Sequence, residues 1–211
     1  DFERLQQWPL RNKLCVYKPQ RRGISLLDVR HIGTFLFYSY LATNLNATKI
    51  DLAPYNLHRQ PKRVHPSPSV LPETERQAIC ATLAALLLDG IDLQCMAKSA
   101  HWNARGPLFL ELHKLFGKIS AALVEHNDNV AERIVTLGGD AVGTCRMVGL
   151  GTRLEDYIGG TEPLLDRMHM FLKLAHAARA SMTDLDTQDL LTQLIRELEK
   201  YAWQLLAMVQ R

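Results

Sequence analysis

Two histidines and two acidic residues in this chain are spaced as metal ligands could be. His101 and His113 lie on either side of a Gly-Pro pair at 106–107, and Asp128 and Glu132 follow four residues apart. Imidazole nitrogen and carboxylate oxygen together suit iron, and also zinc or manganese. Taken singly, each residue has an ordinary alternative, because helical histidines are usually core or surface residues and acidic pairs usually face solvent. The set becomes a candidate site only if the fold brings its members together.

The expected helices decide which of these side chains can meet. His101 lies five residues before Gly106 and His113 six residues after Pro107. An antiparallel helical hairpin that turns at this point would bring the two imidazoles to similar heights. By contrast, 15 residues separate His113 from Asp128, which is roughly 22 Å at about 1.5 Å per residue. These two residues of one chain cannot bind the same ion.

A second copy of the chain offers a way to combine them. If two copies of this helix cross antiparallel near Ser120-Ala121, His113 of one copy faces Asp128 of the other, and a two-fold axis makes the contact twice. Small residues around the crossing would permit a close approach: Gly117, Ser120, Ala121 and Ala122. Ordinary packing within one chain explains the same small residues equally well, so both interpretations stay open.

The apolar pattern predicts an all-α fold for residues 69–211. Apolar residues at helical spacing predict helices over 72–102, from 107 to the Gly-Gly pair at 138–139, from 161–163 to about 182, and through 190–206. We expect Asp186 and Asp189 to open the last helix as an N-terminal cap. A long crossover between the second and third helices should carry a short helix near 154–158. Two hairpins joined by one crossover make a ferritin-like four-helix bundle.

Residues 1–68 differ in character and predict a basic, largely irregular N-terminal extension. Residues 1–65 hold 11 Lys/Arg and 4 Asp/Glu, a balance of +7, so the net charge of +3 leaves −4 for the rest. The prolines between 43 and 70 favour an extended or disordered linker. Basic side chains here could neutralise DNA phosphates without reading sequence, although a solubilising or targeting tail is equally consistent. The candidates for DNA contact are Lys18, Arg21, Arg22, Lys49, Arg59, Lys62 and Arg63.

Other features bound the location of the protein. The chain has no run of 18 apolar residues, which argues against a membrane-spanning helix, and the apolar stretch 32–42 is too short for one. Whether residues 1–44 belong to the mature protein is open. The four cysteines show no metal-ligand spacing, and Cys80 and Cys95 fall in an apolar helical pattern. We therefore expect buried, reduced thiols and a reducing, cytoplasmic compartment.

Several motifs together resemble the Dps family, the DNA-binding proteins from starved cells. They are the run 98–109 (KSAHWNARGPLF), then Leu112-His113, the run 128–133 (DNVAER) and the run 137–139 (LGG). The resemblance covers about residues 45–211, with NATKIDL at 46–52 as the lead-in and Tyr201-Ala202-Trp203 in the closing helix.

The resemblance implies a homo-oligomeric shell of twelve subunits with a ferroxidase site at each two-fold interface. His101 and His113 would come from one subunit, Asp128 and Glu132 from its neighbour, and Trp102 would lie beside the site. Ferrous iron would be oxidised there, preferentially by hydrogen peroxide, and stored as a ferric mineral. This chemistry would protect DNA in the cytoplasm, in association with the nucleoid.

Two departures from the family pattern qualify that expectation. The family has an aspartate four residues after the second histidine, where this chain has Gly117. Glu125 is the better placed substitute, because His126 falls on another face of the helix. The segment 169–179 (HMFLKLAHAAR) also lacks the acidic residues that line the family's three-fold pore. Asp184, Asp186 and Asp189 are the nearby alternatives, but we expect them rather to cap the last helix. His169 and His176 in that segment are expected to be surface or pore residues.

These departures keep two other functions open. One is a shell that binds and compacts DNA while its ferroxidase site is degenerate because of Gly117. The other is a shell that holds zinc or manganese without redox turnover.

Overall fold

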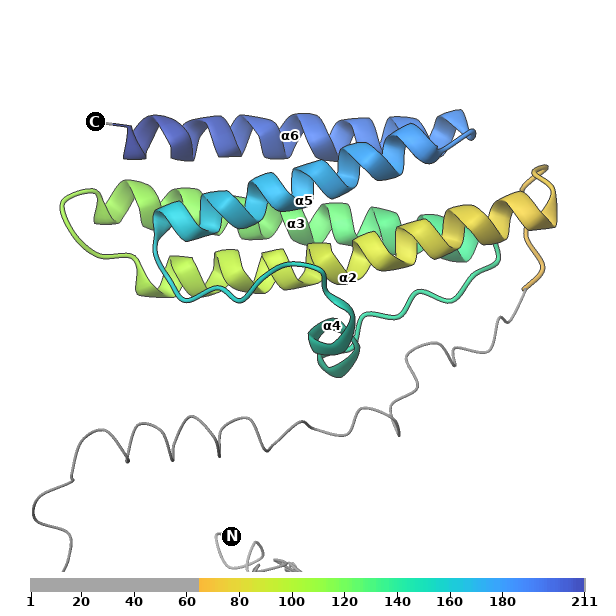
Figure 1. The fold of residues 1–211 in the computed structure, drawn as a ribbon, viewed down its shortest axis with the longest axis horizontal. Coiled ribbons are helices and arrows are strands. Elements are labelled where there is room, and N and C mark those ends of the chain that lie inside the picture. Colours follow the sequence, from red (N-terminus) through yellow and green to blue (C-terminus); the bar gives the residue numbers. More distant parts are fainter. Residues whose placement is uncertain (1–64, 211) are drawn as a thin grey trace, which may run out of the picture. The chain divides into compact units, whose positions relative to one another are not determined.

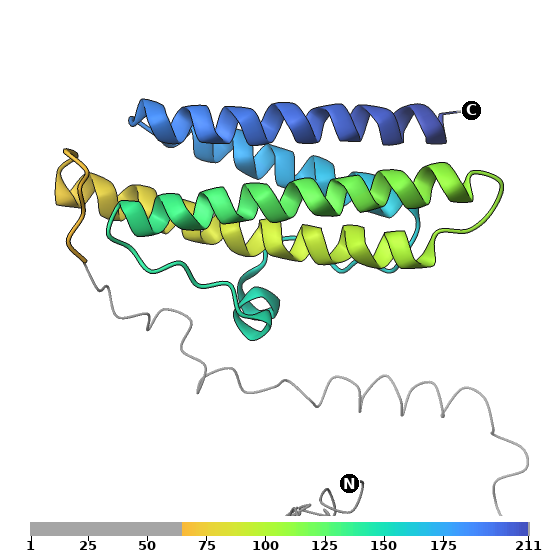
Figure 2. The same ribbon diagram turned by 180° about the vertical axis from the view of Figure 1, so that it is seen from behind.

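A computed structural model describes residues 65–210 of the chain, and every regular element among them is a helix (Figure 1). The helices are α2 (Glu73–Asn103), α3 (Phe109–Thr136), α4 (Cys145–Gly151), α5 (Thr161–Ser181) and α6 (Leu185–Val209). Helices α2 and α3 form one hairpin, α5 and α6 form the other, and the crossover that carries α4 joins them (Figure 2). The predicted all-α, ferritin-like four-helix bundle is confirmed.

The bundle is held by one apolar core to which all four long helices contribute. Leu83, Leu123, Phe171 and Leu198 are fully or almost fully buried, one from each long helix. Among the described helices, α2 alone is long and apolar enough to cross a membrane by length and composition. Its apolar stretch is 44% buried inside the bundle, so packing in the core accounts for much of its composition.

The helix ends follow the sequence signals in most places. The predicted ends of α2 and α3 lie within two residues of the observed ones, and α3 stops where Gly138 adopts a φ of +88°. Of the three aspartates expected to cap α6, only Asp184 does so. Asp184, rather than Asp186 or Asp189, precedes this helix, and its carboxylate accepts a hydrogen bond from the Thr187 backbone N–H. A cap must stand before the first turn, and α6 begins earlier than its apolar pattern indicates.

The short crossover helix also lies elsewhere than predicted. Helix α4 covers 145–151, whereas 154–158 is not helical. Glycines lower helix propensity, yet Gly143 and Gly151 let this segment approach α2. A Cβ on either glycine would lie 2.5 Å from the side chain of Ile91 or Leu88, respectively. Close packing on α2 therefore outweighs the poor local propensity of the segment.

An extended segment precedes α2, and we call residues 65–71 the strap. It is hydrogen-bonded to the C-terminal end of α3 through His65 and Ser67. Residues 1–64 lie outside the described part of the chain, and the seven basic residues predicted to contact DNA are among them. The boundary between an extension at 1–68 and the bundle stays a prediction.

The described cysteines are Cys80, Cys95 and Cys145, and all three are free thiols. The expectation of burial is wrong for Cys95, which is exposed on α2, while Cys80 is partly buried and donates to the Ile134 carbonyl.

Candidate metal centre

The hairpin of α2 and α3 brings His101 and His113 into direct contact. The two imidazole rings stack with centroids 3.8 Å apart and an angle of 23° between their planes. The contact exists because His101 lies in the last turn of α2 and His113 in the second turn of α3, on either side of the connecting loop. The similar heights expected from the spacing are thus realised, and both side chains are only partly buried.

Each histidine is also hydrogen-bonded to the backbone of the other. Nδ1 of His101 lies 2.7 Å from the His113 carbonyl oxygen, and Nδ1 of His113 lies 2.9 Å from the His101 carbonyl oxygen. A carbonyl oxygen only accepts, so each Nδ1 must carry the hydrogen and donate it. In a neutral imidazole the lone pair is then on Nε2, and neither Nε2 makes a hydrogen bond within the described chain. This is the arrangement that orients a histidine ligand toward a metal.

Two aromatic residues border this pair. Phe109 packs on the His113 ring, with centroids 5.4 Å apart, and Trp102 follows His101 with 71% of its surface exposed. The resemblance drew attention to Trp102, but the sequence reasoning missed Phe109. The i, i+4 spacing of Phe109 and His113 at the start of a helix was the available signal.

Gly117 lies directly against His101. A Cβ at this position would be 3.1 Å from Nδ1 and 3.3 Å from Cε1 of the His101 ring, which is tighter than ordinary van der Waals contact. The glycine therefore leaves the space that the ring occupies. A larger residue here, including the aspartate of the family pattern, requires the His101 ring to move by a few tenths of an ångström.

The two acidic candidates, Asp128 and Glu132, lie further along α3, and both are exposed. Asp128 and Glu125 line an open groove of about 580 Å³ between α2 and α3. The same groove is bordered by Ala121 and by Val124, which is 55% exposed. Within the described residues of one chain, no three His, Cys, Asp or Glu side chains are grouped as metal ligands. The histidine pair and the two acidic residues thus lie apart within one chain. We call them the histidine half-site and the acidic half-site of the candidate centre.

Two of the other candidate histidines have carboxylate partners of their own. His126 lies 3.0 Å from a carboxylate oxygen of Glu197 on α6, away from the groove. His176 makes a similar contact of 3.0 Å with Glu199, and His169 is exposed on α5.

Comparison with known proteins decides the family. The model of the ferritin-like domain matches residues 80–211. A DNA protection during starvation protein from Agrobacterium fabrum is 32% identical over 158 residues, covering 70% of this chain and 98% of that protein. The chain belongs to the Dps family.

Solved structures of Dps proteins have the same fold. DpsC from Streptomyces coelicolor is 32% identical with a TM-score of 0.67, covering 70% of this chain and 92% of that one. A Dps protein from Vibrio cholerae is 28% identical with a TM-score of 0.61, covering 66% and 94% respectively, and is described as a ferritin-like diiron-carboxylate protein. The Dps resemblance found in the sequence is confirmed.

Proposed function

We propose that this Dps protein binds and oxidises ferrous iron at a centre shared between two subunits and stores the product as a ferric mineral. The paired imidazoles carry the proposal, because reciprocal hydrogen bonds fix both rings with their Nε2 lone pairs available. His101 and His113 would supply the nitrogen ligands. Asp128 and Glu132 of a second copy would supply the carboxylates.

The exposed face of α3 supports a pairing of two subunits. Residues spaced three or four apart lie on one side of a helix, and those from His113 through Gly117, Ala121 and Val124 to Asp128 follow this rule. Of their small or apolar members, Ala121 and Val124 are exposed in one chain, Val124 at 55%. An antiparallel crossing near Ala121 would cover these residues and bring each histidine pair to the acidic residues of the other copy. A homo-oligomer, with twelve subunits as in our sequence expectation, is therefore part of the proposal.

The proposed reaction consumes iron and peroxide together. Two ferrous ions each give one electron to hydrogen peroxide, the O–O bond breaks, and with two protons the oxygens leave as two water molecules. The ferric ions then hydrolyse, release protons and enter the mineral. Removing both reactants at once would protect DNA, in keeping with the name of the Agrobacterium relative, and fits a cytoplasmic protein near the nucleoid.

Stopped-flow oxidation of ferrous iron by limiting peroxide tests this function. We expect rapid oxidation by the wild type and a loss of at least about tenfold in His101→Ala. His176→Ala is the matched control, because that histidine pairs with an exposed glutamate instead, and it should react like the wild type. Equal rates for wild type and His101→Ala would contradict the proposed centre.

Gly117 supports one alternative, a DNA-compacting shell with a degenerate site. Gly117 offers no carboxylate beside His101, and the predicted basic extension could bind phosphates. In that case the wild type would bind DNA in a salt-dependent manner and oxidise no iron. Zinc or manganese as the resident ion stays a prediction that metal analysis of the isolated protein can test.

A further inference from the structure

The C-terminal end of α3 is capped by groups from outside the helix. An α-helix leaves its last carbonyl groups without partners of its own. Here Ser67 Oγ donates to the Thr136 carbonyl at 2.6 Å, and Arg76 Nη1 donates to the Leu137 carbonyl at 2.9 Å. The backbone N–H of His65 donates to the Gly138 carbonyl at 3.0 Å. The strap and the first turns of α2 together satisfy the end of α3.

Gly138 makes room for this contact. Its φ of +88° is a conformation that favours glycine, and a Cβ on it would lie 2.6 Å from the His65 carbonyl oxygen. The close approach of the strap therefore depends on a residue without a side chain at this position.

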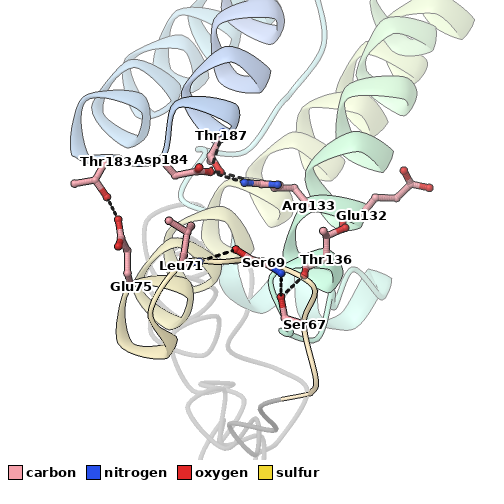
Figure 3. A network of polar contacts seen from close by, with 10 residues as sticks. All are labelled: Ser67, Ser69, Leu71, Glu75, Glu132, Arg133, Thr136, Thr183, Asp184 and Thr187. Carbon is pink, nitrogen blue, oxygen red and sulfur yellow. Dashed lines mark hydrogen bonds and ion pairs between the residues drawn. The ribbon is translucent and has the colours of Figure 1, made fainter.

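The strap is organised by its own hydrogen bonds (Figure 3). Ser67 Oγ accepts from the Ser69 backbone N–H at 3.1 Å, and Ser69 Oγ accepts from the Leu71 N–H at 3.2 Å. Prolines alternate with these serines at 66 and 68 and restrict φ. The Ser67 hydroxyl thus joins the internal order of the strap to the end of α3.

Glu132 belongs to the turn that the strap caps. Thr136 Oγ1 donates to the Glu132 carbonyl at 2.8 Å, while Ser67 donates to the Thr136 carbonyl. The next residue, Arg133, donates hydrogen bonds to Asp184, the cap of α6, and to Thr187 in its first turn (Figure 3). Asp128 lies one turn further from the helix end. Fraying of the last turn would therefore displace Glu132 before Asp128.

From this arrangement we propose that the strap is a positioning element for Glu132, so that anchoring of the chain at Ser67 sets the metal affinity of the acidic half-site. The proposal rests on the proposed function, because it takes Glu132 as a ligand. Ser67 itself touches no metal in this scheme. It acts by keeping the last turn of α3 helical.

Binding of Co²⁺ to the full-length assembled protein, followed by calorimetry and by visible absorption, tests the idea without redox turnover. We expect Ser67→Ala to weaken binding roughly threefold or more and Ser67→Thr, which keeps the hydroxyl, to restore it. Ser181→Ala is the matched control, because it removes a hydroxyl that donates at 2.8 Å to a carbonyl at the end of α5. That variant should bind Co²⁺ like the wild type.

The double variant separates the strap from the metal site. If the strap acts through Glu132, Ser67→Ala should cause no further loss of affinity in a Glu132→Ala background. Hydrogen exchange of the backbone amides at 133–136 should also become faster in Ser67→Ala. Wild-type Co²⁺ affinity in Ser67→Ala, beside weakened binding in Glu132→Ala, would overturn the role of the strap and leave the proposed function intact. Unchanged affinity in Glu132→Ala would instead overturn the ligand assignment, and the strap proposal with it.

Discussion

His101 and His113 each donate an Nδ1 hydrogen to the backbone carbonyl of the other, at 2.7 and 2.9 Å. The two hydrogen bonds tie the end of α2 to the start of α3 and fix both imidazole tautomers at once. Because both acceptors are backbone carbonyl groups at the ends of helices, the two rings are held in place without a metal. If the two histidines bind iron as proposed, side chains held in this way lose less conformational entropy on binding.

Gly117 should be sensitive to the addition of a single methyl group. Gly117→Ala gains up to about 1 kcal/mol of helix propensity but forces the His101 ring to shift. We expect similar stability and several-fold weaker Co²⁺ binding. Gly149→Ala is the matched control, since no atom lies within 4 Å of its added Cβ, and it should leave Co²⁺ binding unchanged. If Gly117→Ala binds Co²⁺ like the wild type, the ring relaxes freely and the tight contact is unimportant.

The ion pair between the buried Asp89 of α2 and the half-exposed Arg153 of the crossover should matter for stability. The Asp89 side chain is fully buried, and Arg153 donates to it from Nε at 2.9 Å and from its backbone N–H at 2.7 Å. Arg153→Met would leave a buried carboxylate without its counter-charge, so we expect a loss of about 3 kcal/mol in the free energy of unfolding. Urea unfolding at fixed protein concentration measures it. The exposed Arg196 of α6 is the control, and an equal loss in Arg196→Met would contradict a specific role for the pair.

Asp184 should make stability depend on pH in the acid range. Burial raises the pKa of Asp184, but hydrogen bonds from Thr187 and Arg133 outweigh burial and lower the pKa below its ordinary value. A lowered pKa in the folded state stabilises the protein above the unfolded-state value of about 3.9, and this contribution is lost as pH falls through the folded-state pKa.

The variant Asp184→Asn checks this expectation by urea unfolding at two pH values. At pH 7 we expect it to be about 1 to 2 kcal/mol less stable than the wild type, with a smaller difference near pH 3. Asp186→Asn, an exposed residue in the first turn of α6, should change stability by no more than about 1 kcal/mol. A difference for Asp184→Asn that does not shrink in acid would show that its carboxylate charge is not responsible.

Assembly should fail together with the iron site when the α3 face is blocked. Ala121 is exposed and lines the groove between α2 and α3, where we place the crossing of two subunits. We expect Ala121→Trp to give smaller particles by light scattering and slow iron oxidation, whereas Ala81→Trp, at an exposed position of α2, should affect neither. Normal particle size and normal oxidation in Ala121→Trp would refute the placement.

The sequence predicted the helices well because their apolar residues recur at helical spacing over long stretches. It failed at α4, where the contacts of Gly143 and Gly151 with α2 decide the structure and are not local. It named Asp184 among three aspartates that could cap α6 but could not single it out, because the cap lies outside the periodic segment.

The candidate site was predictable only in part. Loop spacing indicated that His101 and His113 would be neighbours, but their reciprocal hydrogen bonds depend on the three-dimensional turn between α2 and α3. The bonds of Ser67 to the end of α3 join residues 69 positions apart, and no local pattern announces them. The assignment of Asp128 and Glu132 to a second subunit stays a prediction.

Mixing two inactive variants tests the shared centre most directly. One variant carries His101→Ala and His113→Ala, and the other carries Asp128→Ala and Glu132→Ala; they are unfolded together and reassembled. If each site combines two subunits, half of the random pairs are mixed and each mixed pair holds one intact site of two, so about a quarter of wild-type peroxide-driven iron oxidation should return. Full inactivity of mixed particles that have assembled to normal size would contradict the intersubunit site.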